Sequence, residues 1–169
     1  MASKKKFGLN LIFSGSAIVF AIITIILLCA PAMTYTGKLT ENSVSMASVA
    51  FGNKDDGLAF SFLIFLPYLL LLAGIVLNVL NILGKGGKIL PIVATVCYVV
   101  GAILFFLVMQ TFCIAVPEGL EGELKDAYIK HGKELITEAC DLGLGAIFSG
   151  VLSLVSAGLS ATTLFVKNK

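Results

Sequence analysis

Four long stretches without a single charged residue limit what this chain can fold into. They cover residues 7–33, 58–83, 89–116 and 142–166. A helix needs about 20 apolar residues to cross the hydrocarbon layer of a membrane, and each stretch is long enough. The chain is 58% hydrophobic and only 13% charged, which leaves too little polar surface to cover a soluble core. The sequence therefore predicts a polytopic membrane protein.

Backbone groups inside a membrane must pair with one another, which leaves helices or a closed barrel as spanning structures. The alternation of apolar and polar residues expected of a barrel strand is absent from the four stretches. We predict an all-α integral membrane protein, with residues 1–169 forming a single four-helix transmembrane domain. Residues 34–57 and 117–141 are then two loops on the same side of the membrane.

Lysine positions predict how this domain is oriented. Seven of the twelve basic residues lie in three short flanks that contain no acid, namely Lys4, Lys5, Lys6, Lys85, Lys88, Lys167 and Lys169. All ten acidic residues lie in the loops 34–57 and 117–141. Under the positive-inside rule, both termini and the turn at 84–88 are cytoplasmic, and both long loops are outside. We predict a multi-pass plasma-membrane protein whose lysines contact anionic lipid of the inner leaflet.

The first stretch has an alternative interpretation as a cleavable signal peptide. Its lysine-rich start and the Ala30-Pro31-Ala32 sequence fit a signal peptide with its cleavage site. Its apolar core is about 20 residues long, which exceeds the usual 7–15 residues of such a segment. We therefore expect an uncleaved first span.

Both outer loops contain patterns of local structure. Alternating residues at 43–46 and 48–51 predict extended segments, which could pair with 34–40 in a small β-hairpin. Residues 120–139 predict a short helix in the second loop. Its apolar side is formed by Leu120, Leu124, Tyr128, His131, Leu135 and Ala139. Because acids repel anionic headgroups, we expect this helix to cap the bundle rather than lie on the membrane.

The fourth stretch has a small residue at nearly every fourth position. The predicted helix-packing face consists of Gly145, Ser149, Ser153, Ala157 and Ala161. Small residues let helix backbones approach closely in lipid, where the hydrophobic effect adds little to association. We expect this face to meet other helices of the same chain, with a second copy of the chain as the alternative.

A candidate polar cluster is expected at the cytoplasmic third of the bundle, formed by Asn78, Asn81 and Thr95, with Asn10 and Ser160 at similar depth. Such residues usually form hydrogen bonds between helices. The alternative is that they line a polar path. The second span also contains Pro67, which removes one backbone hydrogen bond and predicts a kink.

The sequence contains no recognisable catalytic, cofactor or metal site. The four stretches lack the ionisable residue that coupled transport usually requires, and His131, the single histidine, lies in a loop. The turn at 84–88 lacks the G-x-x-x-x-G-K-[ST] spacing of a phosphate-binding loop. A net charge of +2 gives no reason to expect a nucleic-acid partner.

Four cysteines leave two interpretations open. Cys113 and Cys140 bracket the second outer loop, and a disulfide between them would tie that loop to the bundle. Free buried thiols are the default alternative. A membrane thiol oxidoreductase is the third and weakest functional hypothesis, because the C-x-x-C pair that such enzymes use is absent.

Four spans, internal termini and a β-containing first outer loop resemble the topology of claudins and tetraspanins. The likeness is one of topology alone, because the chain has no Trp and no cysteine pair in 34–57. We expect a non-enzymatic scaffold or assembly protein that contacts protein partners or itself through its outer loops and small-residue face. The alternative is a subunit of a small oligomeric channel or transporter, whose ligand the sequence does not identify.

Overall fold

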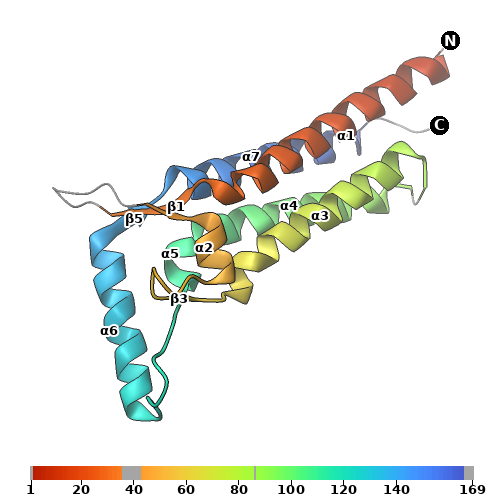
Figure 1. Ribbon diagram of the computed structural model, residues 1–169. Coiled ribbons are helices and arrows are strands. Elements are labelled where there is room, and N and C mark those ends of the chain that lie inside the picture. The colour runs from red at the N-terminus through yellow and green to blue at the C-terminus, as the bar shows by residue number, and fades with distance from the viewer. Residues whose placement is uncertain (1, 36–42, 86, 166–169) are drawn as a thin grey trace.

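Four long helices dominate the computed structural model, which describes residues 2–35, 43–85 and 87–165 and the side chains from Gly8 onward. They are α1 (Ala2–Ile26), α3 (Phe62–Ile82), α4 (Ile89–Phe106) and α7 (Leu144–Thr162) (Figure 1). Each includes a segment that is long and apolar enough to cross a membrane. The fold is therefore that of a mostly helical, multi-pass membrane protein.

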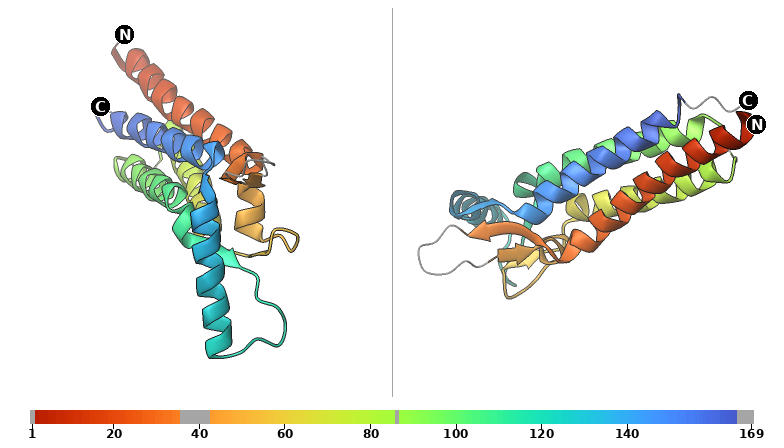
Figure 2. Two further views of the ribbon diagram at one scale, coloured as in Figure 1. Left: turned by 90° about the vertical axis from the view of Figure 1, so that its left-hand side faces the viewer. Right: turned by 90° about the horizontal axis from the view of Figure 1, so that it is seen from above.

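The four helices form a closed bundle in chain order. α3 packs between α1 and α4, and α7 packs between α4 and α1 (Figures 1 and 2). The start of α1, the end of α7 and the turn between α3 and α4 lie together at one end, here called the terminal end. The other end carries the β-strands and is called the sheet end.

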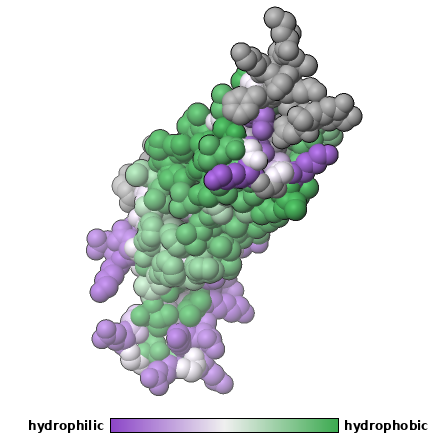
Figure 3. Space-filling view, turned by 90° about the vertical axis from the view of Figure 1, so that its right-hand side faces the viewer, coloured by the Kyte–Doolittle hydropathy of each residue, from purple (hydrophilic) through white to green (hydrophobic). Residues whose placement is uncertain are grey.

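Large apolar side chains cover the outside of the bundle, where Figure 3 shows a continuous hydrophobic surface. The exposed side chains include Ile12, Val19, Leu72, Val76, Val96, Ile103, Val151 and Leu154. Many of the side chains that face the other helices are small or polar, among them Ala17, Ala21, Ala94, Ala146 and Ser156. This inversion of the pattern of soluble bundles suits a helical domain surrounded by lipid.

Segments from both long loops build the sheet end. β1 (Pro31–Tyr35) pairs antiparallel with β2 (Ser43–Ser45) on one side and β5 (Cys140–Leu142) on the other. A second ladder joins β3 (Leu58–Ala59) to β4 (Cys113–Ile114). A hairpin is therefore present as β1 and β2, with β1 starting earlier than the expected segment 34–40, whose residues 36–40 lie outside the described part of the chain. The second loop adds a third strand to it.

Three short helical segments complete the sheet end. They are η1 (Leu27–Cys29), α2 (Met46–Phe51) and α5 (Val108–Thr111). The extended structure predicted for residues 48–51 is wrong, because these residues lie in α2. The hydroxyl of Ser45 accepts a hydrogen bond from the backbone N–H of Ser48, and this cap starts a helix where the alternation suggested a strand.

The helices are shorter than the predicted spans at the sheet end. α1 stops before Pro31, because a residue preceding proline is pushed out of the helical region and Ala30 is extended. α4 ends at Phe106, and α5 follows after a break at Leu107. Residues 31–33, 58–59, 113–114 and 142, all predicted to be within spans, are strands instead. α3 continues through Pro67 without interruption.

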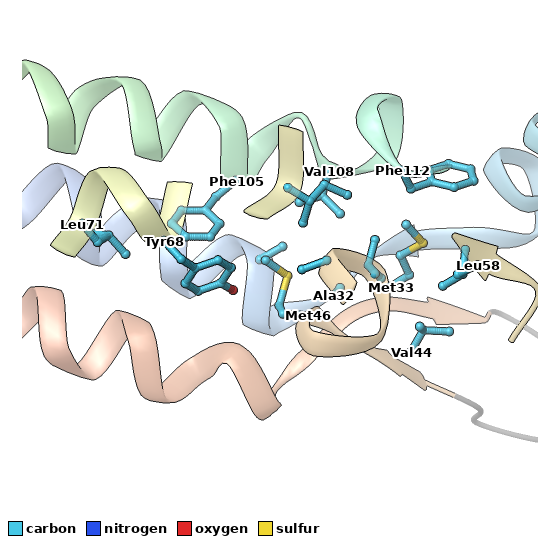
Figure 4. Close-up of a cluster of buried hydrophobic side chains, with 14 of the residues drawn as sticks. Ala32, Met33, Val44, Met46, Leu58, Tyr68, Leu71, Phe105, Val108 and Phe112 are labelled. Carbon is cyan, nitrogen blue, oxygen red and sulfur yellow. The ribbon is translucent and has the colours of Figure 1, made fainter. Parts of the chain in front are cut away.

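A cluster of buried side chains joins the bundle to the sheet end (Figure 4). The rings of Tyr68 and Phe105 meet edge to face, with centroids 5.2 Å apart. Met46 from α2, and Val108 and Phe112 from α5 and the residue after it, continue the cluster toward the strands. The sheet end is thus packed onto the bundle.

α6 (Glu123–Ala139) leaves this compact unit. It extends from the sheet end across the direction of the bundle helices (Figures 1 and 2), and none of its 17 residues is buried. The expectation that it caps the bundle is wrong: Leu124 is 69% and Leu135 is 52% exposed. Its packed edge is instead the one that carries Gly132, which lies against Ile114 of β4.

Candidate functional site

A buried amide at the terminal end joins three of the bundle helices. The side-chain N–H groups of Asn81 on α3 lie 3.2 Å from Oδ1 of Asn10 and 3.1 Å from Oγ of Ser14, both on α1. They lie 3.5 Å from Oγ1 of Thr163, at the end of α7. Asn81 is 5% exposed, so this amide is satisfied by protein groups rather than by bulk water.

A second amide, one helical turn nearer the sheet end, connects α3 to α4 and α7. Asn78 donates from Nδ2 to the hydroxyl of Tyr98 at 3.1 Å. Its Oδ1 accepts from the hydroxyl of Ser160, also at 3.1 Å. The Ser160 hydroxyl lies 3.4 Å from the carbonyl oxygen of Pro91 as well. Asn78 and Tyr98 are fully buried.

The two groups share one link on α7, where the Thr163 hydroxyl donates to the carbonyl oxygen of Ser160 at 2.7 Å. The whole set, here called the polar network, comprises Asn10, Ser14, Asn78, Asn81, Tyr98, Ser160 and Thr163. It contains neutral amides and hydroxyls and connects all four helices. Hydrogen bonds between helices in lipid contribute about 0.6 kcal/mol each on average, so the network stabilises the bundle at this end.

The predicted cluster is brought together only in part. Asn78 and Asn81 are in the polar network, whereas Thr95 is half-buried and donates to the carbonyl of Pro91 in its own helix at 2.7 Å. The prediction omitted Tyr98, the partner of Asn78. The spacing of Pro91, Ala94 and Tyr98 places them on one face of α4 and would have pointed to Tyr98 rather than Thr95.

The predicted packing face of α7 lies mostly inside the bundle. Gly145, Ser149, Ser153 and Ala157 are buried, while Ala161 is half-buried. The contacts are within the chain, with α1 and α4 on either side. A methyl group on Gly145 would lie 2.6 Å from the carbonyl oxygen of Pro31, so the backbones touch here.

Close packing also fills the middle of the bundle. A methyl group on Gly74 of α3 would lie 2.5 Å from the ring of Tyr98 on α4. A methyl group on Gly150 of α7 would lie 2.6 Å from the ring of Phe106. The Tyr98 ring therefore occupies the space that Gly74 leaves between α3 and α4, and the Phe106 ring, which is 40% exposed, covers Gly150 where α4 meets α7.

Three buried hydroxyls toward the sheet end have no hydrogen-bond partner among the described residues. They belong to Tyr68, Ser149 and Ser153. Tyr68 follows Pro67 in α3, yet its hydroxyl does not bond a carbonyl that the proline leaves without a donor. A buried hydroxyl without a partner costs about 1–3 kcal/mol, so these groups are unusual in an otherwise satisfied core.

The cysteines do not form the predicted disulfide in this structure: Cys113 and Cys140 are both free thiols, on separate ladders. Cys140 is buried opposite Tyr35, whose hydroxyl donates to its sulfur. Burial raises the pKa of the Cys140 thiol, and the Tyr35 hydrogen bond lowers it in part. Across the described residues, no group of three His, Cys, Asp or Glu side chains is placed to hold a metal ion.

Comparisons with known proteins identify no relative of this chain. No protein-family model, no curated protein and no solved structure matches the chain. Its function must therefore be inferred from the residues and their arrangement.

Proposed function

We propose that this chain is a non-enzymatic plasma-membrane scaffold or assembly protein whose bundle supports a folded unit at the sheet end, outside the cell. The observation that carries the proposal is the joining of both long loops into one unit. β5 of the second loop pairs with β1 of the first, and β4 pairs with β3. Loops that only connected helices would not need this mutual pairing.

The orientation in this proposal rests on charge. Of the described residues, Lys4, Lys5, Lys6, Lys85 and Lys88 lie toward the terminal end, and the acids at 55–56 and 118–141 lie in the segments on the side of the sheet end. Lysine is retained on the cytoplasmic side of membrane proteins, and this rule supports an orientation with both termini inside and the sheet end outside.

The partner surface proposed is the sheet end rather than α7. The small-residue face of α7 is already covered by α1 and α4 of the same chain. The three-stranded sheet, in contrast, has β2 and β5 as its outer strands, with Ser43 and Asp141 exposed. Outer strands carry backbone groups that can pair with another chain, which suits contact with a second copy or another protein.

A photo-crosslinking amino acid at Ser43 tests this proposal in native membranes. We expect a discrete adduct of defined mass, because Ser43 lies on an outer strand. The same amino acid at Val96, which is 55% exposed on the lipid-facing side of α4, is the matched control and should give no protein adduct. Recovery of uncrosslinked monomer alone from both variants would contradict the scaffold function.

A channel or transporter subunit is the second candidate, favoured by the unpartnered hydroxyls of Tyr68, Ser149 and Ser153. Together with the polar network they place polar groups along much of the bundle core. On this hypothesis the purified protein conducts a solute across liposomes, and Asn78→Leu with Asn81→Leu abolishes the flux. The scaffold proposal expects no flux even from the unsubstituted chain.

A further inference from the structure

Among the described residues, α6 contacts the rest of the protein along an edge that includes Gly132, Lys133 and Ile136. Gly132 lies against Ile114, since a methyl group on this glycine would be 2.8 Å from its side chain. The ammonium group of Lys133 lies 5.6 Å from the centre of the Phe112 ring. Cys140, which follows α6, enters β5.

A second edge of α6 carries an exposed apolar stripe, defined by Leu124, Tyr128 and Leu135. Their spacings of four and seven residues place them on one side of a helix. Their side chains are 69%, 43% and 52% exposed. Residues about half a turn away are charged or polar, including Asp126, Lys130, Lys133 and Thr137. α6 is therefore amphipathic, and its packing within the chain leaves the stripe uncovered.

The position of α6 indicates what covers this stripe. The helix ends at the sheet end of the bundle, and its start lies sideways beyond the margin of the bundle, so that α6 runs across the direction of the spanning helices (Figures 1 and 2). At 17 residues it is about 25 Å long. If lipid surrounds the bundle, a helix that projects sideways from the sheet end lies over that lipid. It then lies at the depth of the headgroups.

The surface of the molecule is continuous in the same direction. Figure 3 shows the molecule from the terminal end of the bundle. The hydrophobic surface extends from the bundle onto the lower part, which contains α6 and the segment before it. Hydrophilic side chains lie along the margins of this lower part. The chain here has apolar residues as well, Ile114, Ala115 and Val116. The lipid-facing surface thus continues toward the stripe.

We propose that α6 is an interfacial helix that lies on the leaflet at the sheet end, with Leu124, Tyr128 and Leu135 inserted at the boundary between headgroups and acyl chains. Tyrosine suits that depth, because its ring is apolar and its hydroxyl reaches the headgroups. Residues 118–141 contain seven acids and three lysines, a net charge of −4 with His131 neutral. The lipid that fits is zwitterionic, since anionic headgroups would repel this segment.

The absence of tryptophan from the chain makes a direct test possible. Leu135→Trp and Thr137→Trp place single reporters two residues apart, on opposite sides of α6. Each full-length variant is reconstituted into phosphatidylcholine vesicles and titrated with iodide in the water and with brominated acyl chains in the lipid. We expect the ratio of bromolipid to iodide quenching to be roughly twofold or more higher for Leu135→Trp, with bluer emission.

Two further arms keep the test decisive. Leu124→Trp, at the most exposed position of the stripe, should repeat the Leu135→Trp result even if the latter variant is misfolded. Phosphatidylglycerol in the vesicles should reduce the bromolipid quenching of both. Equal iodide quenching of stripe and control variants would overturn the proposal. A stripe reporter shielded from both quenchers would also overturn it, because a second copy of the chain would then cover the stripe.

Discussion

Gly145→Ala is expected to lower the free energy of unfolding by about 1–3 kcal/mol, the usual cost of overpacking a tight core. The added methyl group would lie 2.6 Å from the carbonyl oxygen of Pro31 and 2.9 Å from the carbonyl carbon of Ala30. These are backbone atoms, which cannot rotate away as a side chain does. The start of α7 must therefore move from the segment that leads into β1, and the β1–β5 ladder moves with it.

Titration of the purified protein in mild detergent with SDS, followed by circular dichroism, measures this loss. Gly158→Ala is the matched control in the same helix, because a methyl group there meets no atom within 4 Å. Alanine favours helix over glycine by up to about 1 kcal/mol, so the control should be unchanged or more stable. Equal stability of the two variants would show that α7 does not approach the backbone at Ala30 and Pro31.

Asn81→Leu is expected to cost about 1–3 kcal/mol, because it leaves buried polar groups with fewer partners. Asn10 and Ser14 on α1 and Thr163 after α7 each lose a contact with the amide. Thr95→Val is the matched control, since Thr95 bonds only within α4. The control should change stability by no more than about 0.5 kcal/mol. The SDS titration again provides the measurement.

A double-mutant cycle between Asn10 and Asn81 separates the shared hydrogen bond from general effects of each substitution. Asn10→Leu and Asn81→Leu should be less than additive, because the second change removes a bond already lost. Strictly additive losses would mean that α1 and α3 are not joined by this amide. The cycle therefore tests whether the polar network holds the bundle together.

The existence of four helices could be predicted, because a run of about 20 or more residues without charge strongly indicates a membrane-spanning helix. The residues at which these helices stop near the sheet end could not be predicted, because the sequence stays apolar from the helices into the strands. Leu58, Cys113 and Leu142 are as compatible with a strand as with a span, and pairing with another loop decides between them. The helix start at Met46 depends on a single cap, the hydroxyl of Ser45.

Two of the three residues of the candidate polar cluster, Asn78 and Asn81, lie in the polar network, whereas Thr95 does not. Asn78 and Asn81 were recognised from polarity and position, which a sequence shows directly. The hydrogen-bond partners of Asn78 and Asn81 depend on how α1, α4 and α7 are rotated about their own axes. The prediction used polarity alone and therefore chose Thr95 instead of Tyr98. A threonine can satisfy its hydroxyl four residues back in its own helix, as Thr95 does, so it needs no partner across the bundle.

The orientation of the α6 stripe also required the structure. Sequence periodicity identified Leu124, Tyr128 and Leu135 as one side of a helix, and the natural expectation was that this side packs on the bundle. Contacts through Gly132 and Lys133 instead turn a different edge toward the protein. The apolar side of α6 is wider than the edge that packs on the protein, so part of this side stays exposed.

Labelling of single cysteines in intact cells tests the central claim most directly, because the scaffold function proposed for the sheet end requires that end to lie outside. In a chain whose four native cysteines are replaced, Lys130→Cys on α6 and Lys85→Cys in the turn after α3 report on the two ends. A membrane-impermeant maleimide should label Lys130→Cys at once and Lys85→Cys only after permeabilisation. Labelling of Lys85→Cys alone in intact cells would contradict the account.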